Sequence, residues 1–70
     1  MPSQIYEQLS EEELIDYYLW VKDYIKRGFQ VEGLKDELQM IYNTIEVKVT
    51  TSDKDVYLNE IKQLMNEVNY

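Results

Sequence analysis

Residues 9–29, LSEEELIDYYLWVKDYIKRGF, carry the signals for both ends of one amphipathic helix. Ser10 and Glu13 have the spacing of a capping box, in which the hydroxyl accepts from the Glu13 amide and the carboxylate accepts from the Ser10 amide. Leu9 before the cap and Leu14 at the fourth helical position are placed as a hydrophobic staple. We therefore predict that a helix starts directly after Ser10.

The other end of this helix is marked by charge and by a glycine. Lys26 and Arg27 suit the negative end of the helix dipole, and Gly28 can adopt the left-handed conformation that ends a helix. Phe29 would then fold back onto Tyr24, as in a Schellman motif. With its caps, the first helix is predicted over residues 10–28, after an N-terminal arm over residues 1–9.

Two further helices are predicted, over residues 31–49 and 52–69, because apolar residues recur there at intervals of three and four. Thr51, Ser52 and Asp53 are candidate caps of the last helix. Residues 46–51 alternate polar and β-branched side chains, so a short strand or a hinge there stays an alternative. The expected inward-facing residues are Leu34, Leu38, Ile41, Ile45 and Val49, then Val56 or Tyr57, Ile61, Leu64, Met65 and Val68.

The short connection after Gly28 requires the first two helices to be antiparallel neighbours. Two helices of this length cannot close a core alone, so the third packs across them or pairs with another chain. The predicted fold is therefore all-α: a single small domain made of an antiparallel helical hairpin plus a third C-terminal helix.

The composition excludes several classes of function. The chain has 70 residues, no Cys, no His and a formal net charge of −7. Thiol chemistry, disulfides and thiolate zinc sites need Cys, and His is the commonest general base and metal ligand. Asp53 and Asp55 begin like a calcium loop, but the glycine of its sixth position is missing. We expect no enzyme activity, no metal site and no cofactor.

The charge and the size indicate what kind of partner to expect. An acidic chain is poorly suited to bind nucleic acid directly through its phosphates. No apolar run of about 18 residues and no secretory signal is visible, so we expect no membrane contact and a cytoplasmic location. A domain this small buries only about 60% of the surface its unfolded chain exposes, so association adds needed stability. The expected partner is a protein target, and a homodimer is an alternative.

The first helix has more apolar residues than one face can hold. Trp20 and Tyr24, or Leu19 and Ile15, must point away from the inward stripe. Tyr and Trp are enriched at binding hot spots, so this second face is covered either by the third helix or by a partner. The inward stripe consists of Leu14, Tyr17 or Tyr18, Val21 and Ile25. The candidate partner-binding residues are Tyr17, Trp20, Tyr24, Ile25 and Phe29.

Carboxylates gather at the start of the first helix. Glu7, Glu11, Glu12 and Asp16 form a candidate acidic face of about 15 Å. Their density resembles the phosphates of one nucleic-acid strand and falls short of a duplex. This face has two interpretations: it is either a solvated helix start or a mimic of nucleic acid.

Residues 9–18 resemble the opening of the Sda-type sporulation inhibitors, small helical hairpins that bind and block sensor histidine kinases of spore-forming bacteria. The similarity extends from Leu9 to about Ile41, roughly half the chain. The matching residues are Leu9, Ser10, Glu12, Leu14, Ile15 and Tyr18, and Glu32, Leu34, Glu37 and Leu38 fall in or near register with the family's second helix.

The resemblance implies a role for the turn after the first helix. The family's loop hydrophobics contact the kinase, and they correspond to Ile25 and Phe29 when the register is shifted back by one residue. The family has no third helix, so residues 51–70 are an addition.

Two functions follow. The first is a small non-catalytic protein that binds and inhibits or regulates another protein through an aromatic helix–turn surface, with a histidine kinase as the target that the resemblance implies. The alternative is an acidic inhibitor of the type carried by phages, which mimics nucleic acid and blocks the groove of a DNA- or RNA-binding enzyme.

Overall fold

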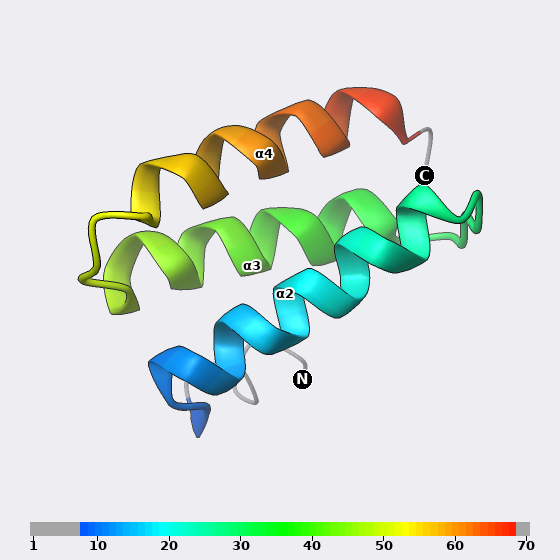
Figure 1. Ribbon diagram of the computed structural model, residues 1–70. Helices are drawn as coiled ribbons and strands as arrows, with labels where there is room; N and C mark the ends of the chain where they lie inside the picture. The colour runs from blue at the N-terminus through cyan, green and yellow to red at the C-terminus, as the bar shows by residue number, and fades with distance from the viewer. Residues whose placement is uncertain (1–7, 69–70) are drawn as a thin grey trace.

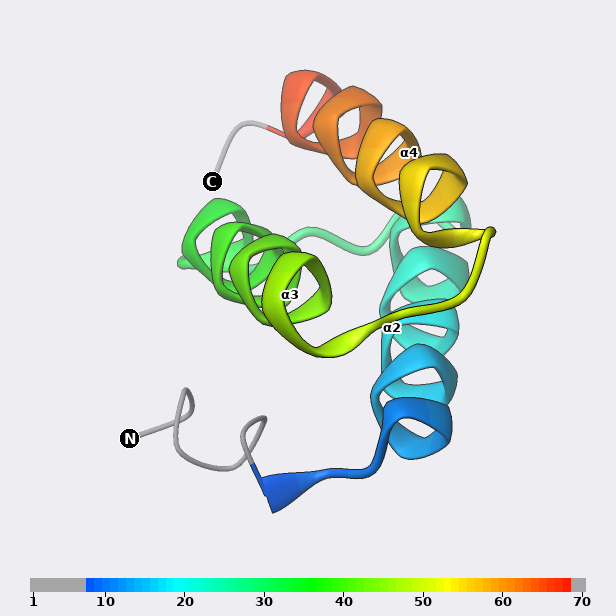
Figure 2. The same ribbon diagram turned by 90° about the vertical axis from the view of Figure 1, so that its left-hand side faces the viewer.

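The computed structural model describes residues 8–68, and within that range the chain forms three helices and no strand. They are α2 (Glu11–Lys26), α3 (Leu34–Lys48) and α4 (Lys54–Glu67). Figure 1 shows the chain passing along α2, back along α3 and forward again along α4. Seen from the side in Figure 2, the helices lie at the corners of a triangle. The all-α prediction is confirmed.

Both ends of α2 follow from the signals around it. The Glu13 amide donates to the Ser10 hydroxyl (3.1 Å) and the Ser10 amide donates to a Glu13 carboxylate oxygen (2.9 Å), which completes the capping box. At the other end Gly28 has a φ of 95° and its amide donates to the Ile25 carbonyl at 2.9 Å. This is the inner hydrogen bond of a Schellman motif.

The connections shorten the other two helices relative to their predicted ranges. Gly33 has a φ of 86°, so α3 begins at Leu34 rather than at residue 31. It continues to Lys48 before Val49 becomes extended, and residues 46–48 are therefore helical. Helix α4 begins at Lys54 rather than at residue 52, and its N-cap Asp53 makes no capping hydrogen bond through its side chain. The predicted end at residue 69 lies outside the described residues.

The core is built from one stripe of each helix. All five inward residues predicted for the second helix are buried. In α4 the prediction is corrected at the first position, because Leu58 is buried whereas Val56 is 53% exposed, and Tyr57 and Met65 are only partly buried. The core residues are Leu14, Tyr18, Val21, Ile25, Leu34, Leu38, Ile41, Ile45, Val49, Leu58, Ile61, Leu64 and Val68.

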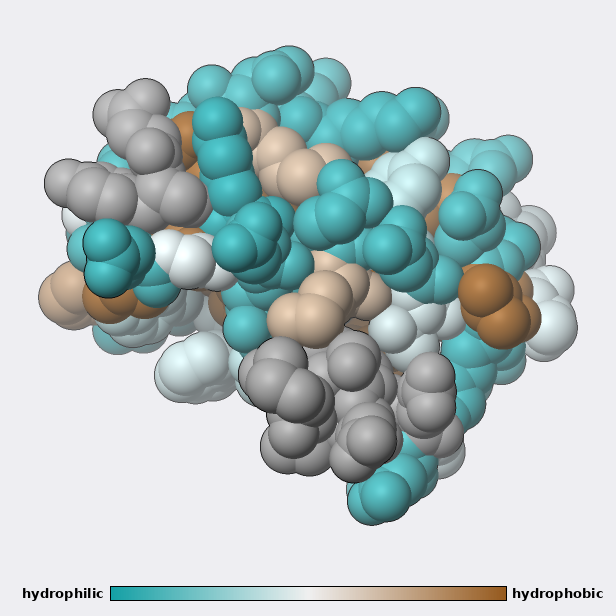
Figure 3. All heavy atoms as spheres, turned by 180° about the vertical axis from the view of Figure 1, so that it is seen from behind, coloured by the Kyte–Doolittle hydropathy of each residue, from teal (hydrophilic) through white to brown (hydrophobic). Residues whose placement is uncertain are grey.

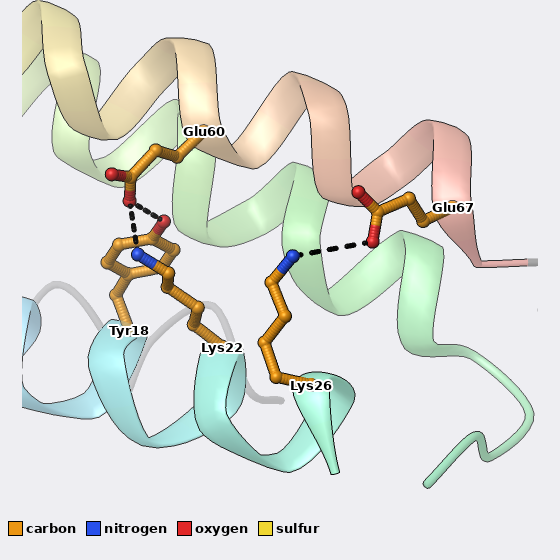
Figure 4. A network of polar contacts seen from close by, with 5 residues as sticks. All are labelled: Tyr18, Lys22, Lys26, Glu60 and Glu67. Atoms are coloured by element: carbon orange, nitrogen blue, oxygen red, sulfur yellow. Dashed lines mark hydrogen bonds and ion pairs between the residues drawn. The ribbon is translucent and has the colours of Figure 1, made fainter. Parts of the chain in front are cut away.

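Polar contacts join α2 to α4 along the edge of this core (Figure 4). The Tyr18 hydroxyl donates to Glu60 Oε1 at 2.6 Å, and Lys22 Nζ donates to the same oxygen at 3.1 Å. One turn further along α2 and two turns further along α4, Lys26 pairs with Glu67 at 3.7 Å. Helix α4 therefore covers the side of α2 that carries Tyr18, Lys22 and Lys26.

One face of the molecule is mainly polar (Figure 3). Figure 3 shows hydrophilic residues over much of the upper part of the molecule, with small apolar areas between them. Among residues 8–68, no helix combines the length and the apolar character that crossing a membrane would require.

Candidate protein-binding surface

Four aromatic side chains form a continuous row on the surface of α2 and the turn that follows it. The ring centroids are 6.2 Å apart for Tyr17 and Trp20, 5.7 Å for Trp20 and Tyr24, and 5.0 Å for Tyr24 and Phe29. Each pair is stacked, with interplanar angles of 23° to 25°. We call these four residues the aromatic ladder.

Local structure sets the ladder in place. Tyr17, Trp20 and Tyr24 follow one another at intervals of three and four and therefore share a helix face. Phe29 joins them because the left-handed Gly28 turns the chain back at the end of α2. The ladder lies on a different side of α2 from Tyr18 and the lysines that contact α4.

Much of the ladder is exposed to solvent. Trp20 is 62% exposed and Phe29 is 52% exposed, whereas Tyr17 and Tyr24 are half-buried. The neighbouring Val31, in the connection to α3, is 48% exposed. Large apolar side chains gathered at one place on a surface are typical of interaction sites, whereas scattered ones are ordinary.

A hollow of about 270 Å³ lies beside the ladder, between α2 and the start of α3. One part of its lining is aromatic and aliphatic, and the other carries two carboxylates, Glu32 and Glu37. The lining residues are Tyr17, Trp20, Val21, Tyr24, Val31, Glu32, Gly33, Leu34 and Glu37.

Glu37 is held at this hollow by Tyr17. The Tyr17 hydroxyl donates to Glu37 Oε2 at 2.7 Å, which joins α2 to α3. Burial raises the pKa of the Glu37 carboxyl above its usual value, because the charged form loses hydration there. Burial also raises the pKa of the Tyr17 hydroxyl, which therefore remains a hydrogen-bond donor at neutral pH.

The structure brings four of the five predicted partner-binding residues together and separates the fifth. Ile25 is only 8% exposed and belongs to the core, so its place on the predicted surface is corrected. The reason is its spacing of four residues from Val21 and seven from Tyr18, which are both buried. Sequence reasoning missed Val31 and the carboxylates of Glu32 and Glu37 as parts of the surface. The available signal was Gly33 itself, because glycine is the residue that readily adopts the positive φ that ends the turn here.

The predicted acidic face is assembled in part. Glu11, Glu12 and Asp16 line a second hollow of about 340 Å³, where Asp53 from the start of α4 joins them. Thr50 donates to Glu11 Oε1 at 3.3 Å, so one of these carboxylates is tied to the α3–α4 connection. Glu7, the fourth predicted member, lies outside the described residues.

Metal binding and comparisons with known proteins give no further assignment. In the part of the chain that the structure describes, no group of three or more Asp or Glu side chains is placed to hold a metal ion. A scan against protein-family models, a search of curated proteins and a search of solved structures each gave no match.

Proposed function

We propose that this chain is a non-catalytic regulatory protein that binds and inhibits another protein through the aromatic ladder. The observation that carries the proposal is the exposure of Trp20 and Phe29 on a side of α2 that α4 does not cover. A small domain gains little from leaving two large aromatic rings in water, whereas such rings supply much of the binding energy at protein interfaces.

The proposed docking unit is the antiparallel hairpin of α2 and α3 with its turn. The contact between Tyr17 and Glu37 joins the two helices, and the contact between Glu11 and Thr50 joins α2 to the connection that follows α3. Helix α4 supports this hairpin from behind through Glu60 and Glu67. The rigid frame keeps the ladder in one arrangement, which lowers the entropy lost on binding.

A sensor histidine kinase is the proposed target class. Its support is the resemblance of residues 9–18 to the Sda-type inhibitors and the exposure of Phe29 in the turn, where that family contacts the kinase. Of the two turn positions that the resemblance indicated, Phe29 remains available to a partner and Ile25 does not.

A photo-crosslinking comparison tests the use of the ladder. A crosslinking phenylalanine analogue replaces Phe29 in one protein and Val56 of α4 in the control, since these side chains are 52% and 53% exposed. In cells of the organism that encodes the chain, position 29 should capture a specific protein that position 56 does not. Equal capture from both positions would contradict the proposal.

The captured protein, once purified, provides the quantitative test. Trp20→Ala should weaken its binding by about 2 kcal/mol or more, roughly thirtyfold, whereas Val56→Ala should leave it unchanged. If the partner is a histidine kinase, wild-type protein should inhibit its autophosphorylation and Trp20→Ala should not.

Salt dependence separates this function from mimicry of nucleic acid. An acidic protein seated in a nucleic-acid groove should lose affinity steeply between about 0.05 and 0.5 M salt, and Glu12→Lys with Asp16→Lys should abolish its binding. A ladder-mediated complex should keep most of its affinity over that range. Mimicry of nucleic acid is the competing function because four carboxylates line the second hollow, those of Glu11, Glu12, Asp16 and Asp53.

A further inference from the structure

The hollow beside the aromatic ladder combines two kinds of surface. Trp20, Tyr24 and Tyr17 supply aromatic rings, and Glu32 and Glu37 supply negative charge. The carboxylates attract cations by ion pairing, and the rings offer apolar contact to the aliphatic stem of a long basic side chain. A side chain that enters this hollow therefore meets a site suited to positive charge.

Glu37 is the carboxylate whose environment most needs a cation. It is half-buried, and within the described residues the one side chain that donates a hydrogen bond to it is the neutral Tyr17 hydroxyl. Among residues 8–68 it forms no ion pair, whereas Asp23, Glu60 and Glu67 each have a basic partner. A carboxylate that loses hydration without gaining a counter-charge destabilises the free protein, and an incoming cation removes that cost.

We propose, building on the function proposed above, that the partner inserts an arginine side chain into this hollow, with its aliphatic stem against the Trp20 and Tyr24 rings and its guanidinium paired to Glu37. A guanidinium is planar, weakly hydrated and donates to carboxylates as a fork, while a lysine ammonium is a strongly hydrated point charge. The hollow, at about 270 Å³, is slightly smaller than sites for drug-sized ligands and suits one side chain.

Charge also argues against a second copy of this chain as the occupant. Its formal net charge is −7, and the rim of the hollow is acidic. Two copies docked through this surface would bring Glu32 and Glu37 of each close to those of the other, and like charges at an interface cost several kcal/mol. A basic segment that carries apolar residues beside its arginine complements both the ladder and its rim.

A peptide titration tests the inference with the full chain. The probes are two helical peptides of identical sequence, one with a single arginine between leucines and one with neutral citrulline in its place. Binding is followed by the fluorescence of Trp20, the single tryptophan of the protein. The arginine peptide should bind at least about tenfold more tightly than the citrulline peptide, and a lysine peptide should fall between them.

Variants at the carboxylates assign the effect to Glu37. Glu37→Gln should reduce the preference for arginine to about threefold or less, while Glu46→Gln, which removes the same charge from an exposed position of α3, should leave it intact. Glu32→Gln, in the exposed connection, should give a partial loss. A preference unchanged in Glu37→Gln, or equal binding of the arginine and lysine peptides, would overturn the proposal.

The same titration distinguishes failure of this inference from failure of the proposed function. If both peptides bind with equal affinity and both lose binding in Phe29→Ala, the ladder is a docking surface and the arginine proposal is wrong. If neither peptide changes Trp20 fluorescence, the arginine proposal is again wrong, and the crosslinking comparison decides separately whether the ladder binds a protein.

Discussion

The Tyr18 hydroxyl lies 2.6 Å from Glu60 Oε1, and this hydrogen bond ties α2 to α4 across 42 positions of sequence. The Tyr18 ring is fully buried and meets the Tyr57 ring edge-on, with centroids 5.7 Å apart. One residue thus belongs to the core through its ring and to the α2–α4 contact through its oxygen. The contact marks the side of α2 that α4 covers.

Removal of this hydroxyl should destabilise the fold. Tyr18→Phe removes the closest hydrogen-bond donor of Glu60 and should lower the free energy of unfolding by about 1.5 kcal/mol. This is the lower end of the range for hydrogen bonds to charged groups, chosen because Glu60 keeps its hydrogen bond from Lys22. Urea unfolding followed by circular dichroism measures the change. Tyr42→Phe is the control, since the Tyr42 hydroxyl makes no hydrogen bond within residues 8–68.

Stability should fall in acid because of Glu60. The Tyr18 hydroxyl, followed by Lys22, holds the pKa of Glu60 below its usual value. The folded state therefore binds this proton less well than the unfolded state, in which the pKa is about 4.3. The stabilisation is present above that pH and is lost as the pH falls through the lower folded-state pKa. Between pH 7 and pH 3, the free energy of unfolding should fall less in Tyr18→Phe than in the wild type.

Glu37 should have the opposite effect on the pH dependence of stability. Burial raises its pKa, so the folded state binds this proton better than the unfolded state, and stability declines as the pH rises through the folded-state pKa. Glu37→Gln keeps an oxygen that accepts from Tyr17 and removes the charge, so it should stabilise the protein at pH 7 and have little effect at pH 3. Loss of stability at pH 7 in this variant would argue that the carboxylate has a counter-charge in the free protein.

Position 28, in the turn after α2, should accept a D-residue without strain but not an L-residue. Its φ of 95° is strained for an L-residue, and no atom outside its chain neighbours lies within 4 Å of an added Cβ. Gly28→Ala should therefore cost about 1 kcal/mol of unfolding free energy from the backbone alone. D-alanine, introduced by chemical synthesis of the 70-residue chain, should instead stabilise it by about 0.5 kcal/mol. Equal effects of both enantiomers would show that strain is absent.

The ladder should contribute little to folding. Trp20→Ala removes an exposed ring and two stacked contacts, so the free energy of unfolding should fall by only about 1 kcal/mol, the lower end of the range for two such pairs. The adjacent Val21 is 2% exposed, and Val21→Ala should cost about 2 kcal/mol. Thermal unfolding of the two variants side by side tests this. A large loss in Trp20→Ala would assign the ladder to the fold rather than to binding.

The local signals of the sequence predicted the local structure well. The capping box at Ser10 and the stop at Gly28 depend only on residues a few positions apart, and both form as expected. The stripe from Leu34 to Val49 is equally self-contained, because the helical period alone places its members on one face. The start of α4 was less predictable, since Val56, Tyr57 and Leu58 are all apolar and only their packing distinguishes them.

The sequence by itself determined that α2 is apolar on two sides, because consecutive residues from Tyr17 to Val21 cannot share one face. Only the tertiary structure decided between those sides. Leu58, Ile61 and Leu64, far along the chain, pack α4 into the shared core, and Glu60 and Glu67 then contact Tyr18, Lys22 and Lys26. The turn at Gly28 brings Phe29 onto the aromatic ladder. The contact between the aromatic ladder and Glu37 depends on how α2 and α3 pack. It joins Tyr17 to Glu37, which are 20 positions apart, so no local sequence pattern predicts it.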